Sequence, residues 1–554
     1  MILSFQALVC SAAMALASAP ALTQWVYEWG FQSISPADNY ATRCHFMPDG
    51  SLLLAGGSGD PMTLGGITWN FPSGFAPTGG YLARLDAAGV VQWAHFIDQP
   101  FNTSTPFTAP VAIGSDDLDN IFIGGQFKDS LHWDGVLVLT DTVNDNVPGA
   151  IYVAKVDPTG ALLWSRALSI DKLRFSDLAV DGTDDVIVTG YTIALNAKGH
   201  LFKLSGMDGS LVFDQVTDPG LAILSGVGTD AVGNILVQGW TYDPFTLGGG
   251  PVCPYNNALG GNAASLFVGK LDPNGIALWY HVPDQGVAPI FGHYYDDAIL
   301  AVAPDGTTGT IVSKAVRIGN DTIADGQGPL NGAYVLDPDG AVLWSRSINT
   351  IGWVWAGDCA FDGEGELLVA GELRDGPVDI ADTVVATSAG LDAWVMRFDT
   401  AGAMSGLMVG PQLLAGVGGG VVTGLAIDDL GKPALCGTFF NTDPVFGPDT
   451  LVGFATSFLA RLVEAPIATG SIALSADLPL KVFPNPADRA IVMHLGVARE
   501  AEVVVYDAPG SEVWSGRISF SSERLDVSNW PEGMYHIRFV HEARSFQARF
   551  IVPH

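Results

Sequence analysis

The feature that most constrains the fold is a recurring thirteen-residue phrase, clearest as Tyr152-Val-Ala-Lys-Val-Asp-Pro-Thr-Gly-Ala-Leu-Leu-Trp164. Asp157, Pro158 and Gly160 occupy the positions that these residue types favour in a type I turn, and the alternating residues on both sides suit half-buried strands. The phrase therefore predicts a β-hairpin. Full or weaker copies recur at 81–93, 202–213, 267–279, 334–344 and 394–404, with a half copy at 458–462.

A second phrase lies between these hairpins and has an apolar strand, a turn rich in Asp and Gly, and a strand that ends near a small residue. Each repeat thus has four strands, which fits a β-propeller blade that buries its faces against its neighbours. An orphan fourth strand at 24–29 and a last repeat that stops at Leu462 would complete one shared blade. We therefore expect an all-β, seven-bladed β-propeller with velcro closure over residues 22–463. Copies of the second phrase occur at 47–56, 116–124, 180–190, 229–239, 304–313, 361–371 and 427–437.

The strand-3 segments of two repeats, Tyr152–Asp157 and Phe267–Asp272, resemble the β-propeller repeats of exported bacterial proteins. This resemblance implies a fold and does not imply an activity, because propellers host many functions. Composition agrees, since 67 Gly, 33 Pro and only 15% charged residues are typical of many short strands joined by turns.

Residues 1–21 combine an apolar stretch with small residues at its end, which predicts a secretory signal peptide. We expect no transmembrane span in the remainder, which has no other apolar stretch of about twenty residues. The net charge of −33 argues against nucleic-acid binding, because it repels phosphate. The cysteines that follow the signal, Cys44, Cys253, Cys359 and Cys436, could form disulfides or stay as buried thiols.

Residues 464–477 have the composition of a linker, and the charge balance changes after it, so we expect a separate domain at 478–554. Its three motifs, which begin near Leu480, Val503 and Leu525, closely resemble the C-terminal sorting domain (type A) of the type IX secretion system. The resemblance implies a small antiparallel β-sandwich, the type IX secretion machinery as a partner, and a product that is secreted or attached to the cell surface. The sorting-signal residues that it implies are Pro484, Asn485, Pro486, Tyr506, Asp507, Gly510, Gly533, Tyr535 and Arg549.

The longest connections all join strands 2 and 3 of a blade or strand 4 to the next blade, so they are expected on one face of the propeller. Because long loops on a rigid scaffold often carry function, this face is the predicted binding surface for a glycan or a protein. We expect a monomer. The candidate ligand-binding residues are aromatic residues and one histidine in these connections: Trp69, Phe71, Trp133, Tyr242, Tyr255, His293, Tyr294, Tyr295, Trp353 and Trp355.

Acidic clusters at 116–119, 144–146, 184–185 and 296–297 could bind Ca2+ as a cofactor, although none has a complete calcium-loop spacing and turn capping explains them more simply. The usual hydrolase and nucleotide-binding motifs are missing from the sequence, so no catalytic residue is predicted. The alternative function is a secreted hydrolase or lyase that uses carboxylates near the propeller axis. Perturbed carboxylates at the axis would favour that alternative.

Overall fold

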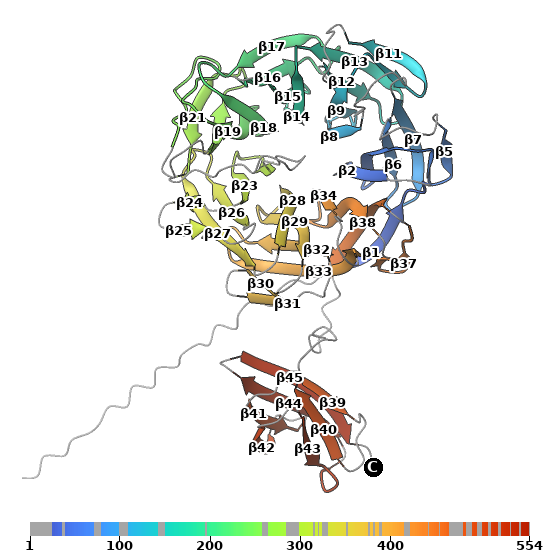
Figure 1. The fold of residues 1–554 in the computed structure, drawn as a ribbon, viewed down its shortest axis with the longest axis vertical. Helices are drawn as coiled ribbons and strands as arrows, with labels where there is room; N and C mark the ends of the chain where they lie inside the picture. Colours follow the sequence, from blue (N-terminus) through green and yellow to red (C-terminus); the bar gives the residue numbers. More distant parts are fainter. Residues whose placement is uncertain are drawn as a thin grey trace, which may run out of the picture. The chain divides into compact units, whose positions relative to one another are not determined.

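The computed structural model divides into two compact units, Met1–Ala465 and Pro466–His554, which are described separately (Figure 1). Its secondary structure consists of β-strands throughout the described residues. The described residues are 25–35, 39–70, 79–98, 109–141, 150–193, 197–256, 264–283, 299–313, 316–318, 321–323, 331–350, 353–374, 377–380, 383–386, 391–414, 421–440, 443–453, 455–464, 480–483, 490–495, 501–507, 511–518, 522–531, 533–541 and 544–552.

In the described part of the first unit, seven antiparallel sheets contain a core of four strands in the order that the repeat predicts. We call these sheets blades 1 to 7. Blades 1 to 3 are β2 (Asn39–Phe46), β3 (Leu52–Ser58), β6 (Gly79–Leu85) and β7 (Val91–Asp98); β8 (Pro110–Ser115), β9 (Ile121–Phe127), β12 (Ala150–Val156) and β13 (Leu162–Ser169); and β14 (Leu173–Val180), β15 (Val186–Thr192), β16 (Gly199–Leu204) and β17 (Leu211–Val216).

Blades 4 to 7 repeat this order, except that the outermost strand of blade 7 comes from the start of the chain. They are β18 (Ala222–Thr229), β19 (Ile235–Thr241), β20 (Ser265–Leu271) and β21 (Ala277–His281); β22 (Ile299–Val302), β23 (Thr308–Ser313), β26 (Asn331–Leu336) and β27 (Val342–Thr350); β28 (Trp353–Phe361), β29 (Leu367–Arg374), β32 (Leu391–Phe398) and β33 (Met404–Leu414); and β34 (Val421–Ile427), β35 (Pro433–Phe439), β38 (Thr456–Glu464) and β1 (Trp25–Gln32).

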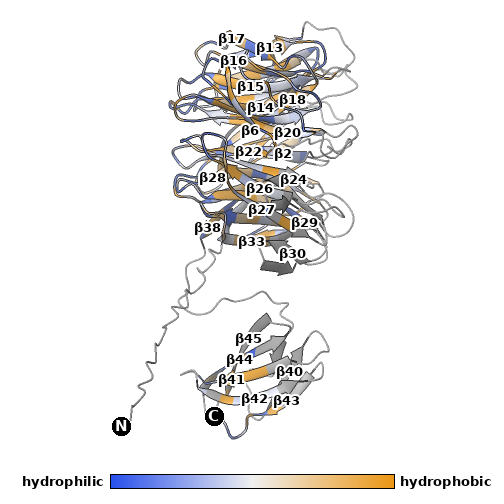
Figure 2. Cartoon of the chain, turned by 90° about the vertical axis from the view of Figure 1, so that its left-hand side faces the viewer, coloured by the Kyte–Doolittle hydropathy of each residue, from blue (hydrophilic) through white to orange (hydrophobic). Residues whose placement is uncertain are grey.

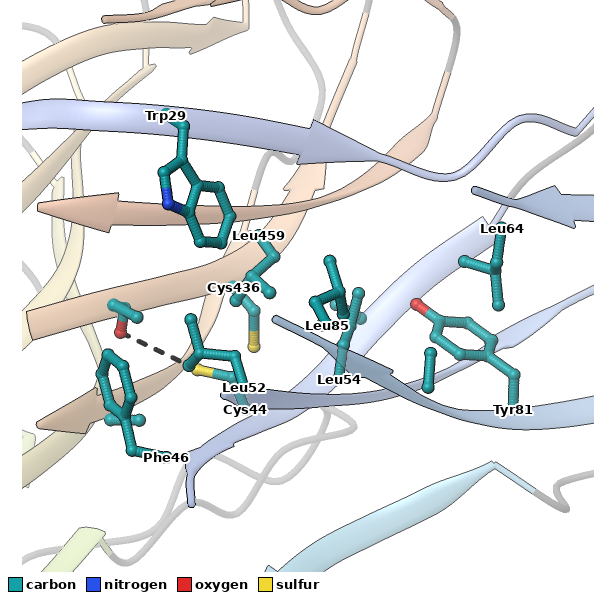
Figure 3. Close-up of a cluster of buried hydrophobic side chains, with 14 of the residues drawn as sticks. Trp29, Cys44, Phe46, Leu52, Leu54, Leu64, Tyr81, Leu85, Cys436 and Leu459 are labelled. Carbon is teal, nitrogen blue, oxygen red and sulfur yellow. Dashed lines mark hydrogen bonds between the residues drawn. The ribbon is translucent and has the colours of Figure 1, made fainter. Parts of the chain in front are cut away.

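The blades form a ring in which the first strand of each blade is innermost. These strands contact one another in succession, from β2 through β8, β14, β18, β22 and β28 to β34, and β34 contacts β2 (Figure 1). The outer strand β1 pairs antiparallel with β38, from Trp25 opposite Glu464 to Gln32 opposite Phe458. Hydrophobic residues concentrate in the strands (Figure 2), and they pack between adjacent blades, as in the cluster that joins blades 7 and 1 (Figure 3).

The cation of the recurring phrase is buried against a carboxylate of the same blade. In blade 2, Lys155 Nζ lies 2.8 Å from Asp116 Oδ2, and the two side chains are 9% and 0% exposed. The same Nζ donates to the carbonyl oxygen of Gly206 in blade 3 at 2.9 Å. The cation therefore joins strands within its blade and also holds the next blade. Equivalent pairs are Lys203–Asp181, Lys270–Asp230 and Arg461–Asp428, whereas Arg84 and Arg397, at the same position of the phrase, pair with Asp49 and Glu366 from other positions of the 1-2 turn.

The aromatic residue that ends the phrase packs on the 3-4 turn of the following blade. Trp29 Nε1 donates to Ala87 O at 3.1 Å, and a Cβ on Gly89 would lie 3.0 Å from the indole ring. Gly89 has a φ of 81°, so the turn needs glycine for its backbone as well as for this close approach. The same contact recurs between Trp93 and Gly160, Trp164 and Gly209, Phe213 and Gly275, Trp279 and Gly340, and Trp344 and Gly402.

The long connections between strands 2 and 3 contain short hairpins, where the sequence predicts loops. Within the described residues, part of this connection pairs in four blades with the fourth strand of the preceding blade or with the residues just after it. We call these four connections straps. The straps of blades 2 and 6 extend the sheets of blades 1 and 5, through β10 (Ser130–Trp133) with β11 (Val136–Thr140) and β30 (Pro377–Ile380) with β31 (Thr383–Ala386). The straps of blades 1 and 4 form isolated bridges, from Thr63 to Ile34 and from Thr246 to Asp218. Further short hairpins are β4 (Met62–Leu64) with β5 (Ile67–Trp69), β24 (Val316–Ile318) with β25 (Asp321–Ile323), and β36 (Val445–Phe446) with β37 (Asp449–Thr450).

The described part of the second unit contains two antiparallel sheets, as the resemblance to a small β-sandwich implies. Alternate residues of the longer strands are buried, among them Val503, Val505 and Ile537, which gives this unit a core of its own. One sheet contains β39 (Leu480–Phe483), β40 (Ala490–Leu495) and β43 (Ser522–Asp526), and the other β42 (Glu512–Ile518), β41 (Ala501–Tyr506), β44 (Gly533–His541) and β45 (Arg544–Val552).

Candidate functional site

Two of the predicted ligand-binding tryptophans belong to hairpin strands and serve packing. Trp69, on β5, stacks on Phe96 with ring centroids 4.7 Å apart, and Trp133, on β10, is 7% exposed and stacks on His95 at 5.3 Å. Both therefore hold a connection against blade 1. Phe71, His293, Tyr294 and Tyr295 lie outside the described residues.

The prediction that Trp353 and Trp355 lie in a long connection is wrong. Both belong to β28, the innermost strand of blade 6, where they pair with Arg374 and Glu372. β28 extends over Trp353–Phe361, so it begins before the apolar run from which its position is predicted. Its first residues are two bulky aromatic residues, which in sequence resemble an inserted loop.

Tyr242 and Tyr255 lie in the strap of blade 4, and both are half-buried. The strap is held at several points, because Cys253 N donates to Phe245 O at 2.8 Å and Tyr242 N to Leu221 O at 2.9 Å. Trp69 is half-buried as well, but its ring stacks on Phe96. The two tyrosines therefore combine partial exposure with an ordered backbone in a connection outside the main strands.

Next to Tyr255, the backbone is fixed by Asn256. The backbone N–H of Asn256 donates to Ser265 Oγ at 3.1 Å, and Ser265 Oγ donates back to Asn256 O at 2.7 Å. These two hydrogen bonds fix the position of the Asn256 backbone. The Asn256 amide also donates to Pro283 O at 3.1 Å. The backbone that carries Tyr255 is consequently held by hydrogen bonds both before this residue, at Cys253, and after it, at Asn256.

A second group of interest, which the sequence analysis missed, lies on the innermost strands. Six of these strands have a register shift near their middle, and the residue after it is charged in blades 1, 3 and 6. These residues are Arg43, Asp177 and Asp358. The equivalent residues of the other shifted strands are small: Ala112, Gly226 and Gly424. A signal existed, because each charged residue stands four positions before the first residue of a 1-2 turn.

The carboxylates of Asp177 and Asp358 each bridge to the next blade. Asp177 accepts hydrogen bonds from Leu178 N at 2.9 Å and from Val227 N at 3.2 Å. Asp358 likewise accepts from Cys359 N and from Leu425 N in blade 7, both at 2.9 Å. Arg43 donates to Thr423 O of blade 7 at 2.6 Å. These side chains join inner strands that no sheet connects.

The same carboxylates have perturbed acidity. Burial raises the pKa of Asp177 to about 6, although the charge of Arg43 and two backbone N–H donors lower it. Burial also raises the pKa of Asp358, against the charge of Arg43. His45 lies on β2 two residues after Arg43, and burial lowers its pKa to about 4. Protonated Asp177 and neutral His45 can therefore coexist near pH 5.

The perturbed Asp177 predicts a pH dependence of stability. Because the folded pKa lies above the ordinary value of 3.8, the folded protein binds more protons between pH 4 and pH 6, and stability falls as the pH rises through that window. Asp177→Asn cannot ionise, so its stability relative to the wild type should rise by up to about 3 kcal/mol between pH 4 and pH 7. Denaturant midpoints at both pH values measure this, with the exposed Asp171→Asn as the control. Parallel pH profiles for wild type and Asp177→Asn would contradict the assignment.

The acidic residues considered for Ca2+ act in turns where the structure describes them. Asp116 Oδ1 accepts from Leu118 N and Asn120 N at 3.0 and 2.8 Å. Burial raises the pKa of Asp116, but hydrogen bonds from Lys155 and Asn120 outweigh this effect and bring the pKa below its ordinary value. Over the described ranges, no three or more His, Cys, Asp or Glu side chains are grouped so as to hold a metal ion. Residues 144–146 and 296–297 lie outside those ranges.

The described sorting-signal residues belong to the four-stranded sheet of the second unit and its turns. Tyr535 is 3% exposed, donates through its hydroxyl to Pro531 O at 2.6 Å, and lies 5.0 Å from the ring of Trp530. Tyr506 ends β41, Asp507 accepts from Ser511 N at 2.6 Å, Gly533 begins β44, and Arg549 pairs with His536. Pro484, Asn485, Pro486 and Gly510 are outside the described residues.

Residues 481–553 match the family model described as "Secretion system C-terminal sorting domain". No match was found among the curated proteins. The described residues contain no helix of the length and apolarity that crossing a bilayer requires.

Several solved structures have a similar arrangement at low identity. A europium-containing methanol dehydrogenase is 12% identical over 79% of this chain and 93% of its own, with a TM-score of 0.37. PorZ, a surface component of the type IX secretion system of Porphyromonas gingivalis, is 12% identical over 97% and 99%, with a TM-score of 0.19. The β-propeller domain of the trilobed protease of Pyrococcus furiosus is 6% identical over 76% and 99%, with a TM-score of 0.38. At these scores the similarities carry no argument about activity.

The sheets and the matched C-terminal region together define an exported β-propeller protein. The chain carries a type IX C-terminal sorting domain, which indicates a secreted protein of a kind that is often attached to the cell surface, and which implies interaction with the type IX secretion machinery.

Proposed function

We propose that this exported propeller is a non-catalytic binding protein that holds a glycan or a protein segment on the face formed by its long connections. The observation that supports this most is the strap of blade 4. It presents Tyr242 and Tyr255 half-exposed on a backbone that is hydrogen-bonded on both sides. Aromatic rings that are already fixed in place bind sugars or apolar side chains with a small loss of conformational entropy.

Rigidity distinguishes this strap from an ordinary surface loop. Thr246 Oγ1 donates to Asp218 O at 2.7 Å, which ties the strap to blade 3, and Asn256 ties it to Pro283 beyond the fourth strand of blade 4. Blade 4 and its predecessor therefore hold the two tyrosines jointly. Insertions that gather on one face of a propeller can form a binding site that spans two blades.

The experiment is a glycan array with the full exported chain, followed by the variant Tyr242→Ala/Tyr255→Ala. We expect saturable binding to one class of glycan, weakened about tenfold or more in the double variant. Met207→Ala is the matched control, because Met207 is 85% exposed in a 3-4 turn on the opposite face; it should bind as the wild type does.

Binding that survives the double variant would place the ligand elsewhere and refute this face. A blank array with correctly folded protein would leave a protein ligand or the alternative, a hydrolase or lyase. In that case, the activity of the wild type and of Asp177→Asn should be compared on a panel of substrates. Activity lost in the variant would favour the enzyme, because a carboxyl with a pKa of about 6 suits acid/base chemistry.

A further inference from the structure

Two of the described cysteines meet where the ring closes. Cys44 is on β2, the innermost strand of blade 1, and Cys436 is on β35 of blade 7; they are 7% and 0% exposed. Both belong to the core cluster that joins these blades, together with Trp29, Leu459 and Tyr81 (Figure 3). Cys253 and Cys359 belong to two other core clusters.

Three observations place the side chains of Cys44 and Cys436 next to each other. Cys44 Sγ lies 3.7 Å from the carbonyl oxygen of Ala434, which precedes Cys436 by two residues on the same strand. Gly424 pairs with Cys436 across the sheet. A Cβ on Gly424 would lie 2.8 Å from Cys436 Sγ and 3.1 Å from Cys44 N. Figure 3 shows both sulfurs between the same strands, with the Cys44 sulfur directed toward the carbonyl oxygen of Ala434.

We propose that Cys44 and Cys436 form a disulfide in the exported protein, which covalently joins the first and last blades. The two thiols become one disulfide by thiol–disulfide exchange with the disulfide of an oxidised dithiol oxidoreductase of the cell envelope. The two electrons and the two protons of the thiols pass to the oxidoreductase, whose disulfide is reduced to a dithiol. Such bonds persist in the oxidising compartments that exported proteins enter.

The location gives the bond a purpose. Blades 1 and 7 are connected by side-chain packing and by the pairing of β1 with β38, so the ring can open at this junction without breaking a covalent bond. A disulfide between residues 44 and 436 would enclose nearly the whole propeller in one loop, and long loops gain the most from such a cross-link in the chain-entropy account. A hydrogen bond with Cys436 and burial raise the pKa of the Cys44 thiol, so thiol–disulfide exchange takes place during folding, before the core excludes the oxidant.

The test uses the full chain recovered after export and alkylated under denaturing conditions without reductant. We expect peptide mapping to show the Cys44 peptide linked to the Cys436 peptide, with Cys253 and Cys359 alkylated. Quantitative alkylation of Cys44 and Cys436 in never-reduced protein would overturn the proposal. This measurement needs no variant, so it stands even where a substitution prevents folding.

A second measurement addresses the effect on stability. Reductant should lower the Tm of the wild type by roughly 5 °C or more. Cys44→Ala/Cys436→Ala should lose this response to reductant, and the matched control Cys253→Ala/Cys359→Ala should keep it. An identical reductant response in both double variants would also refute the bond.

Discussion

Lys155→Met is expected to lower the free energy of unfolding by about 3–5 kcal/mol, because it leaves the Asp116 carboxylate buried without its counter-ion. The Nζ–Oδ2 distance is 2.8 Å, and the side chain of Asp116 is 0% exposed. The substitution also removes the donor to Gly206 O in the next blade. Denaturant midpoints measure the loss.

Blade 5 shows which second change should restore stability. At the positions of Lys155 and Asp116 it has Val335 and Ala303: Val335 pairs with Trp344 as Lys155 pairs with Trp164, and Ala303 N donates to Thr307 O in the same turn position. Lys155→Val/Asp116→Ala should therefore lose much less than Lys155→Met, because no charge stays buried.

An exposed pair of the same type provides the control. Lys198 Nζ lies 2.9 Å from Asp218 Oδ1, but these side chains are 26% and 78% exposed. Lys198→Met should cost under about 1 kcal/mol, because solvent screens the pair. Equal losses for Lys155→Met and Lys198→Met, or a double variant less stable than the single, would contradict the role of the buried pair.

The repeating phrases predicted most of the propeller because each local signal has one partner within its own repeat. An alternating apolar run, a turn with Asp157, Pro158 and Gly160, and a second run specify a hairpin without reference to the rest of the chain. The recurrence of Lys155 and Trp164 in other repeats then has a physical cause, since these side chains hold the next blade.

The straps were missed because their partners lie in the preceding blade. β10 pairs with β7 through only His132 and Trp133, too short a strand to show an alternating pattern. A signal was present in the two-residue turns flanked by apolar residues, as at Trp133-Asp-Gly-Val136 and Leu64-Gly-Gly-Ile67. Aligning these turns between repeats would have predicted hairpins where loops were expected.

The candidate site was predictable only in part, because exposure depends on neighbours that the sequence does not order. Trp133 and Tyr255 both occur in long connections, yet one ring is buried against His95 and the other is half-exposed. Blade 6 shows the same limit. Gly406 stands opposite Arg397, where other copies of the phrase have an aromatic residue. Trp25 of β1 supplies a ring there instead, and its centroid lies 5.3 Å from Arg397 Cζ.

Trp29→Ala is expected to cost about 3–5 kcal/mol, because it removes a buried indole where the ring closes. Trp29 is 8% exposed, packs on Gly89 of blade 1, and donates to Ala87 O at 3.1 Å. Blade 3 predicts the milder change: Phe213 fills the equivalent place against Gly275. Trp29→Phe should therefore keep the packing and lose one hydrogen bond, at about 1 kcal/mol.

Val26→Ala, on the same strand but at a side chain 45% exposed, is the control and should cost well under the loss for Trp29→Ala. Denaturant midpoints rank the three variants. A Trp29→Ala protein as stable as Val26→Ala would mean that β1 is not needed to close the ring. The expected order, with Trp29→Phe between the two, would instead show that an aromatic ring packed on a turn glycine holds the ends of the propeller together as it holds each pair of blades.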